Sequence, residues 1–504
     1  MPKVYSAAVV GLSAEVIEIE VGILPGLPTT VVVGLPDTSV QESRERVRFA
    51  IKNSNCSYPR SRVAINLAPA DLPKNGSQFD LPIAISILLN SEQIMFDAEE
   101  IMLVGELALD GAVRPVVGLL PIILEAKLRG FKKIIVPLGN TVEASLVDGI
   151  EIIPVESLIQ TIGYLQKLVR VIPIKPVDWN ELQTNPSDGL DFKLINGQEA
   201  GKRALEVAAA GGHNILMYGP PGAGKTLLAK AMPLILPKLD VEEMLEITKI
   251  YSVAGLLAGK QNVITKRPFR NPHHSSSAVS LVGGGSHPKP GEISLAHRGV
   301  LFLDELPEFQ RTVLENLRQP LEEGTVTISR AFGTIQFPAN FMLVAAQNPC
   351  PCGYYNSPDQ NCICTYQQIF NYQRKISGPL LDRIDIFMEI AKVEYSKLSE
   401  NTSGENSEAV QKRVQLARDI QKDRFKDSKL LTNGEMGLKE IIKHCILKDE
   451  EKEFVRRAAI KLNLSARGYH RVLKLARTIA DLACSERIEV KHLAEAIQYR
   501  TKNA

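Results

Sequence analysis

Two short segments near the middle of the chain carry side chains suited to phosphate chemistry. The first is a glycine-rich turn that runs through Gly219, Pro220, Pro221, Gly222, Ala223, Gly224, Lys225 and Thr226. Backbone N–H groups of such a turn close around phosphate oxygens, the lysine adds a positive charge, and the threonine hydroxyl can reach Mg²⁺. The second segment ends in Asp304 and Glu305, which can hold Mg²⁺ and polarise an attacking water. Together they predict a site that binds and hydrolyses ATP, with Mg²⁺ held through Thr226 and Asp304.

The elements around these two segments favour the same prediction. Residues 214–218 form a short apolar run that predicts a buried strand before the turn, and residues 227–232 predict the helix after it. An Asp-Glu pair after a buried strand can also be no more than the start of a helix. Its occurrence together with a phosphate-binding turn favours the hydrolysis site. Further strands that alternate with helices predict a parallel sheet between two helical layers.

Composition limits the class of protein. The chain has 504 residues, of which 44% are hydrophobic and 23% charged, as is typical of a globular protein with about three or four domains. Its formal net charge of +2 predicts no overall basic field, so a nucleic-acid surface would have to be local. The N-terminus lacks the pattern of a targeting segment, no apolar run reaches membrane-spanning length, and the seven cysteines are too few for a disulfide framework. We therefore expect a cytoplasmic protein that contacts no membrane.

Changes of pattern along the chain predict an α/β fold class divided into domains. Residues 1–172 mix short β-branched runs with helices. Strands are expected there at 14–21, 29–33, 62–67, 101–104 and 133–136. The polar, proline-containing residues 173–190 predict a linker. Residues 191–394 would then form the ATP-binding domain, and the helical spacing of residues 395–504 predicts a closing helical domain.

Three further residues are candidates for completing the site, because ATP hydrolysis needs groups that sense the γ-phosphate and neutralise the spreading charge. Asn348 ends an apolar strand and could orient the attacking water beside Glu305, although Asn348-Pro349 is also an ordinary turn signal. Arg383 lies between two aspartates and could form an internal salt bridge instead. Arg467 is part of a basic helix start, which could also be a solvated helix face.

Four cysteines gather within fifteen residues. Cys350, Cys352, Cys362 and Cys364 form two Cys-x-Cys pairs separated by nine residues. Pairs so close suit tetrahedral thiolate ligation of Zn²⁺, although the spacing differs from the commoner Cys-x-x-Cys arrangement. The alternatives are four free thiols in a polar loop or, less expected in the cytosol, disulfides. The sequence thus predicts a possible accessory Zn²⁺ site.

Two local basic segments could contact DNA. Lys266, Arg267 and Arg270 lie in a long basic, glycine-containing insertion between the phosphate-binding turn and Asp304. Residues 325–337 predict a hairpin with Arg330 and an aromatic residue near its tip, which could contact phosphate and stack on bases. The alternative is an ordinary hairpin with an exposed charge. Two adjacent histidines of the insertion could be structural or metal-binding.

Longer motifs extend the comparison to a known family. The segments at 212–216, 267–274, 290–297 and 301–309 resemble those of AAA+ ATPases of the magnesium-chelatase-like group, specifically the bacterial ComM/YifB family. The resemblance covers essentially the full chain. It implies that Asn348 is the first sensor, that Arg383 is a finger inserted into a neighbouring subunit's ATP, and that Arg467 is the second sensor on the helical lid, with Arg471 as the alternative.

The resemblance also implies an assembly and partners. A finger supplied in trans needs a neighbour, so a ring, commonly a homohexamer, is implied. In such rings, hairpins similar to that at 325–337 line the central channel. The implied partner is DNA, single-stranded or branched, with no small-molecule substrate beyond ATP. The implied fold is a central three-layer αβα AAA+ domain with a C-terminal helical lid.

The N-terminal domain resembles the proteolytic domain of Lon, an α+β fold of the ribosomal S5 domain 2 type. The resemblance rests on residues 74–84, 104–107 and 118–123. The position of the protease serine holds Gln78, with Ser77 one residue away, and the position of the lysine holds Leu120. Because a Ser-Lys pair needs both groups, we expect no peptidase activity and a structural or DNA-contacting role.

The family resemblance makes a DNA branch-migration helicase or translocase the expected function, in support of recombination and integration of transforming DNA. Two alternatives remain. A magnesium-chelatase motor is disfavoured by the Lon-like domain and by the lack of an acidic metal-loading domain. A protein-remodelling or proteolytic ATPase is disfavoured by Gln78 and Leu120.

Overall fold

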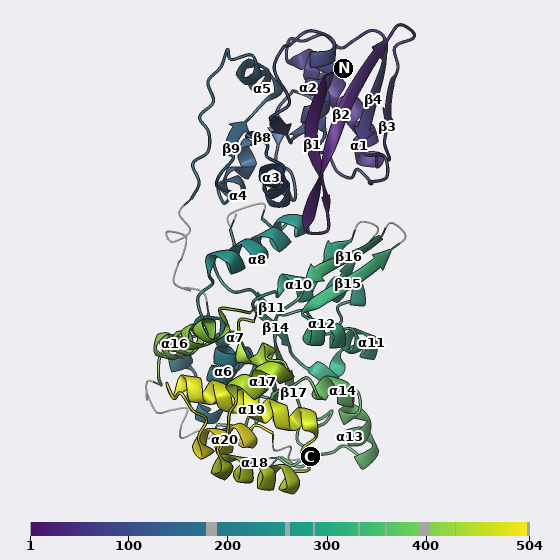
Figure 1. Ribbon diagram of the computed structural model, residues 1–504. Helices are drawn as coiled ribbons and strands as arrows, with labels where there is room; N and C mark the ends of the chain where they lie inside the picture. The colour runs from purple at the N-terminus through teal and green to yellow at the C-terminus, as the bar shows by residue number, and fades with distance from the viewer. Residues whose placement is uncertain are drawn as a thin grey trace. The chain divides into compact units, whose positions relative to one another are not determined.

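The structure is a computed structural model that describes residues 2–177, 189–257, 263–285, 288–330, 333–357, 360–393, 404–428 and 430–500. They form two compact units, the first comprising Met1–Gln183 and Val241–Thr265 and the second Thr184–Asp240 and Lys266–Ala504 (Figure 1). The chain therefore passes between the units three times. Most of the predicted linker 173–190, and the predicted boundary between residues 394 and 395, lie outside the described residues.

The first unit is built on a seven-stranded mixed sheet in the order β3-β4-β2-β1-β5-β8-β9. β2 pairs antiparallel with both β1 and β4, and the other neighbours are parallel. The strands are β1 Lys3–Val10, β2 Ser13–Leu24, β3 Thr30–Val33, β4 Arg62–Ala68, β5 Ile101–Leu103, β8 Lys133–Pro137 and β9 Glu151–Val155, with a separate pair β6 Glu106–Leu107 and β7 Val113–Arg114. The five strands predicted in this region are confirmed, and β1, β6, β7 and β9 are additional.

Helices cover both faces of this sheet. They are α1 Thr38–Asn53, α2 Asp80–Asn90, α3 Leu119–Leu128, α4 Thr141–Ala144, α5 Leu158–Leu165 and α8 Val241–Ala254. Val4 and Ala8 of β1 enter one core and Ala7 enters another, because successive strand residues point to opposite faces. α8 packs beside α3, and its Leu245 contacts the second core. A helix from the middle of the chain thus belongs to the N-terminal unit.

The second unit contains a five-stranded sheet in the order β11-β14-β17-β10-β18, in which every neighbouring pair is parallel. Its strands are β10 Ile215–Tyr218, β11 Phe269–Arg270, β14 Val300–Leu303, β17 Met342–Gln347 and β18 Ile386–Glu389. The predicted parallel sheet is confirmed. Two antiparallel pairs stand apart from it, β12 Gly283–Gly284 with β13 Lys289–Pro290 and the hairpin of β15 Thr325–Arg330 with β16 Gly333–Pro338.

The described helices of the second unit are α6 Glu199–Gly211, α7 Lys225–Ile235, α9 Ala278–Val282, α10 Glu292–Leu295, α11 Arg311–Glu315, α12 Arg318–Glu323, α13 Tyr366–Gln373, α14 Gly378–Leu381, α16 Ser407–Phe425, α17 Leu438–His444, α18 Asp449–Lys461, α19 Ala466–Leu482 and α20 Val490–Gln498. Helices α6, α7 and α16 to α20 share one hydrophobic core with the sheet. α16 packs on α6 and α7, and α19 packs on α6 (Figure 1). The C-terminal region is helical as predicted, and its helices complete the core that supports β10.

Candidate active site

Strand order brings the predicted ATP-site residues to one edge of the five-stranded sheet. β17 lies between β10 and β14 and is parallel to both. The phosphate loop, residues 219–226, follows β10, Asp304 follows β14, and Asn348 follows β17. Because parallel strands end on the same side, these residues leave the sheet together at its carboxyl edge. Open parallel sheets bind their ligands at this edge.

The phosphate loop has the backbone conformation that its glycines allow. Gly222 and Gly224 have φ angles of 75° and 92°, which side chains with a Cβ atom rarely adopt. A Cβ atom added at either glycine would meet no described heavy atom within 4 Å, so the space above the loop is open. At Gly219, by contrast, a Cβ atom would lie 2.1 Å from the Ile390 carbonyl oxygen. The loop is thus close-packed at its start and open at the N-terminus of α7.

Lys225 is buried and is held by neutral oxygen atoms. Its Nζ donates to the carbonyl oxygens of Gly219 and Pro220, both at 2.8 Å, and to Oδ1 of Asn348 at 3.1 Å. Burial lowers the pKa of Lys225, while the nearby carboxylates of Asp304 and Glu305 act in the opposite direction. A buried ammonium group surrounded by neutral acceptors is well suited to receive an anion. The donor set therefore fits a phosphate group.

Thr226 and Asp304 offer the oxygen atoms for a magnesium ion. The Thr226 hydroxyl donates to Oδ2 of Asp304 at 2.8 Å. Hydroxyl and carboxylate oxygens are the ligands that Mg²⁺ prefers, and it commonly takes one or two from protein and the rest from phosphates and water. This pair fits Mg²⁺ carried by a nucleotide.

Glu305 stands in a strained conformation beside a histidine. Its φ of 52° is uncommon for a residue other than glycine, and its side chain is 54% exposed. Nδ1 of His274 lies 3.6 Å from Oε2 of Glu305, and the His274 ring lies 4.1 Å from that of His273. The sequence left the role of these histidines open. Only their motif, at 267–274, marked them as a pair of interest.

Asn214 ties the start of β10 to the segment that carries Arg383. The Asn214 side chain donates to the Arg383 carbonyl at 2.9 Å and accepts from the Leu343 N–H at 2.8 Å. Its backbone N–H donates to Oδ2 of Asp385 at 3.0 Å. Asn214 therefore joins β10, β17 and the segment before β18, a role that sequence reasoning did not assign to it.

Arg383 pairs with a distant glutamate and not with either neighbouring aspartate. Its guanidinium donates to Glu322 of α12 and to the Pro379 carbonyl. Asp385 instead lies 3.7 Å from His213 and 3.5 Å from Arg471. Burial alone would raise the pKa of Asp385, but His213 and Arg471 hold it at about 2. The internal salt bridge considered for Arg383 exists, with a partner that the sequence did not indicate.

Arg383 and Arg467 line the same cavity, of about 530 Å³. Arg471, on the same helix as Arg467, also lines it and donates to the Ile384 carbonyl at 2.7 Å. Among the described residues that line this cavity, none comes from the phosphate loop. Arg383 and Arg467, the two arginines predicted to act on the nucleotide, therefore line one cavity.

The residues predicted to contact DNA differ from one another in their surroundings. Arg267 donates to the carbonyl oxygens of Pro237 and Arg298, and Arg270 forms a two-point ion pair with Glu292 at 2.6 and 2.8 Å. Lys266 also makes an interaction within the protein. Arg330 ends β15 at the tip of the β15–β16 hairpin, but its side chain and the neighbouring residues 331 and 332 lie outside the described set.

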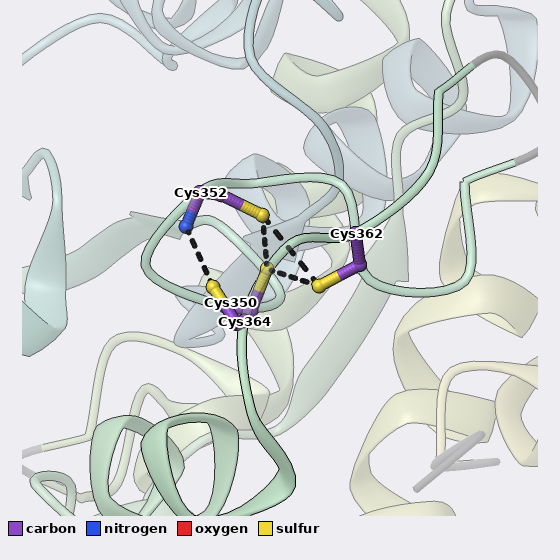
Figure 2. A group of neighbouring side chains, drawn as sticks. All are labelled: Cys350, Cys352, Cys362 and Cys364. Atoms are coloured by element: carbon purple, nitrogen blue, oxygen red, sulfur yellow. Dashed lines mark hydrogen bonds between the residues drawn. The ribbon is translucent and has the colours of Figure 1, made fainter.

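The four clustered cysteines come together as the spacing suggested (Figure 2). The four Sγ atoms lie within 4.8 Å of one another, with separations of 3.4 Å for Cys350 and Cys352 and 3.5 Å for Cys352 and Cys362. A disulfide needs sulfur atoms about 2.05 Å apart, and all four cysteines are free. Backbone N–H groups, chiefly that of Tyr354, lower the pKa of Cys352 to about 6.

The residues at the positions of a protease dyad do not form one. Gln78 and Leu120 are both buried. The Ser77 hydroxyl donates to the Glu106 carboxylate, and Lys127 pairs with Asp148 at 2.8 Å. Ser77 and Lys127 are thus each bonded to a carboxylate.

Comparison with known proteins assigns the family. Three family models match: "Subunit ChlI of Mg-chelatase" at residues 19–140, "Magnesium chelatase, subunit ChlI" at 191–398, and its C-terminal model at 404–500. A Lon protease of Bacillus subtilis, Lon protease 2, is 29% identical over 147 residues, or 28% of this chain and 27% of the relative.

Two relatives match nearly from end to end. Competence protein ComM of Haemophilus influenzae is 45% identical over 505 residues, which cover 99% of this chain and 97% of the relative. The uncharacterized protein YifB of Escherichia coli is also 45% identical, over 501 residues, 99% of this chain and 96% of the relative. The chain therefore belongs to the ComM/YifB family of magnesium-chelatase-like AAA+ ATPases.

Proposed function

We propose that this protein assembles into a ring, a homohexamer, that hydrolyses ATP to drive branch migration of DNA during recombination and integration of transforming DNA. The observation that carries the ATPase part is the convergence of the phosphate loop, Asp304 and Asn348 at one sheet edge. The DNA part is supported by the relative named competence protein ComM. We place this activity in the cytoplasm. No helix among the described residues is long and apolar enough to cross a membrane.

The residues of the chain divide the work of hydrolysis. The N–H groups of the phosphate loop and Lys225 bind the triphosphate, and Lys225 exchanges its neutral partners for phosphate oxygens. Thr226 and Asp304 are the proposed ligands of Mg²⁺, which supplies charge neutralisation to the phosphates when bound. Glu305 accepts the proton of the attacking water, and Asn348 orients that water. Each role uses a group that stands at the open carboxyl edge.

Arg383 and Arg467 are proposed to act on the nucleotide of a neighbouring subunit. Both line a cavity to which the phosphate loop contributes none of the described lining residues. Arg383 would stabilise the charge on the transferring phosphoryl group, and Arg467 would sense the same nucleotide. The ion pair of Arg383 with Glu322 would then be exchanged for the neighbour's γ-phosphate.

We assign DNA contact first to Arg330 at the tip of the β15–β16 hairpin, and then to Lys266, Arg267 and Arg270. The hairpin supports this assignment because its two strands pair over six positions and Arg330 belongs to the last pair. Arg267 and Arg270 already serve partners within the chain, so their contribution to DNA binding is secondary. A tip arginine in each subunit of a ring would meet phosphates of single-stranded or branched DNA.

We also propose that Cys350, Cys352, Cys362 and Cys364 bind one Zn²⁺. Four sulfur atoms at about 2.3 Å from a central ion lie about 3.8 Å apart in a regular tetrahedron. The separations of 3.4 to 3.7 Å between three of them approach this value. Four thiolate ligands that can adopt a tetrahedral arrangement favour Zn²⁺ over Mg²⁺ or Ca²⁺.

The test compares ATPase rates with different effectors. We expect single-stranded DNA or a four-way junction to stimulate hydrolysis, and Lys225→Ala to abolish it. Stimulation by a porphyrin alone would support the magnesium-chelatase alternative, and stimulation by casein a protein-remodelling function. A rate that none of the DNA substrates changes would count against the DNA motor.

A further inference from the structure

The described residues of the loop between β17 and α13, 348–357 and 360–365, link the four-cysteine cluster to the nucleotide site at several points. Asn348, which accepts from Lys225 at 3.1 Å, stands two residues before Cys350. On the returning arm, Cys364 directly precedes Thr365, which caps α13 with a reciprocal pair of bonds to Gln368. The cluster thus joins the two arms of a loop that begins at the first sensor.

The helix that follows the cluster reaches back to the start of the loop. Gln373, the last residue of α13, donates through Nε2 to the Pro349 carbonyl at 3.4 Å. Pro349 lies between Asn348 and Cys350. The position of Asn348 is therefore fixed from both directions, by β17 before it and by the cysteine loop with α13 after it.

The same loop touches the phosphate loop directly. A Cβ atom at Gly353 would lie 2.5 Å from both Cγ and Cδ of Pro221, closer than any Cβ atom can approach without displacement. Gly353 has a φ of 88°, and its N–H donates to Sγ of Cys350 at 3.2 Å. One residue is thus bound to the thiolate cluster and packed against the phosphate loop.

We infer that the four-cysteine cluster, when it binds Zn²⁺, acts as a clamp. The clamp fixes the position of Asn348, the first sensor, relative to the phosphate loop. This inference rests on the ATPase function proposed above. Without the ion, the sulfur contacts between the two arms are weak, because thiols are poor hydrogen-bond partners. The Asn348 side chain and the packing surface of Pro221 then lose their common support. Zinc occupancy thereby sets the rate of hydrolysis at a site that the ion does not touch.

The test separates zinc binding from the packing that the zinc supports. Cys362→Ser and Cys364→Ser should remove the metal, measured by mass spectrometry of the purified full-length protein. Gly353→Ala keeps all four cysteines and should retain zinc while it displaces Pro221. Ile363→Ala is the matched control, because Ile363 lies between two of the cysteines and is 86% exposed.

Two readouts are used, hydrogen exchange of the backbone at residues 215–226 and 342–349 and the kcat and KM for ATP. We expect faster exchange in both segments and a kcat lower by about tenfold, with KM changed less, in the cysteine variants and in Gly353→Ala. Ile363→Ala should match the wild type. Chelation of zinc from the folded wild type should reproduce the cysteine variants, and added Zn²⁺ should reverse the change.

The outcomes distinguish the clamp from the proposed function. The inference would be overturned if the wild-type protein, purified from cells supplied with zinc, contained no zinc. Zinc-free Cys362→Ser protein with unchanged exchange and kcat would also overturn it, while the ATPase function would stand. Zinc-dependent exchange in a protein that hydrolyses no ATP would instead support the clamp and overturn the function.

Discussion

At the scale of single residues, the side chains of the nucleotide site are already arranged to bind an anion. Lys225 is buried, and its hydrogen bonds go to two backbone carbonyls and to Asn348. Glu305 is more than half exposed and lies close to His274. The proposed function therefore gives the two charged groups separate tasks, binding for the lysine and water activation for the glutamate.

This division predicts the effect of Glu305→Gln. The amide keeps the size of the side chain but accepts no proton, so kcat should fall by about 10² to 10⁴ while binding of a fluorescent ATP analogue stays near the wild-type level. Phosphate release and analogue binding measure the two effects. Lys225→Ala is the control, because it should lose binding as well. Equal loss of binding in both variants would contradict the separate roles.

Residue types could be assigned from sequence where the chemistry is local. The phosphate loop and the Asp304-Glu305 pair can be recognised from the residues next to them in the sequence. The proximity of His274 to Glu305, and of Gly353 to Pro221, joins residues far apart in the chain. These contacts follow from strand order and loop packing, which no local pattern encodes.

At the scale of elements, Asn214 connects three parts of the second unit. Its side chain and backbone bond to the Arg383 carbonyl, the Leu343 N–H and the Asp385 carboxylate. The start of β10 is therefore hydrogen-bonded directly to the segment that carries Arg383.

Asn214→Ala should both destabilise the protein and slow ATP hydrolysis. It removes two side-chain hydrogen bonds in a partly buried position, which costs about 1–3 kcal/mol. Urea unfolding monitored by circular dichroism and steady-state ATPase assays measure the two effects. Asn371→Ala, at an exposed position of α13, is the control and should change neither. A full-rate Asn214→Ala enzyme would argue against this connection.

The β15–β16 hairpin allows a test of DNA contact that leaves the ATP site intact. Arg330→Ala should leave basal ATPase unchanged and lower DNA affinity by about tenfold or more, because each subunit of a ring loses one phosphate contact. Fluorescence anisotropy with labelled single-stranded DNA, at several salt concentrations, measures this. Lys461→Ala, at the exposed end of α18, should bind DNA as the wild type does. Unaltered affinity of Arg330→Ala would remove the hairpin from the DNA path.

Period and turn signals predicted the central strands β10, β14 and β17 of the parallel sheet and the C-terminal helices, but not strands β11 and β18. The sequence did not predict the unit to which helix α8 belongs, because this depends on a tertiary contact. It follows the phosphate-loop helix in sequence, yet Leu245 packs against the core of the N-terminal unit. Sequence pattern alone places such a helix in the domain that surrounds it in the chain.

At the scale of the whole molecule, we propose that the active site is shared between subunits. Among the described residues that line the cavity with Arg383 and Arg467, none belongs to the phosphate loop of the same chain. A heterologous, ring-closing contact would bring the cavity of one subunit to the phosphate loop of the next. The monomer then holds two halves of two different sites.

Subunit mixing tests this sharing. Lys225→Ala and Arg383→Ala proteins should each be inactive, but an equal mixture should regain activity at about a quarter of its sites, where an intact phosphate loop meets an intact arginine. Steady-state ATPase assays after co-incubation measure the recovery. A Lys225→Ala, Arg383→Ala double variant mixed with either single variant is the control and should restore nothing. No recovery in the equal mixture would indicate that Arg383 acts within its own subunit.

The measurement that tests the central claim most directly is migration of a four-way DNA junction with heterologous arms and homologous centre, resolved on a gel over time. The account predicts that the wild-type protein converts the junction to duplex products in the presence of ATP and Mg²⁺, that Glu305→Gln binds the junction without converting it, and that Arg330→Ala converts it poorly. A wild-type protein that hydrolyses ATP and leaves the junction unconverted at every protein concentration would contradict the account.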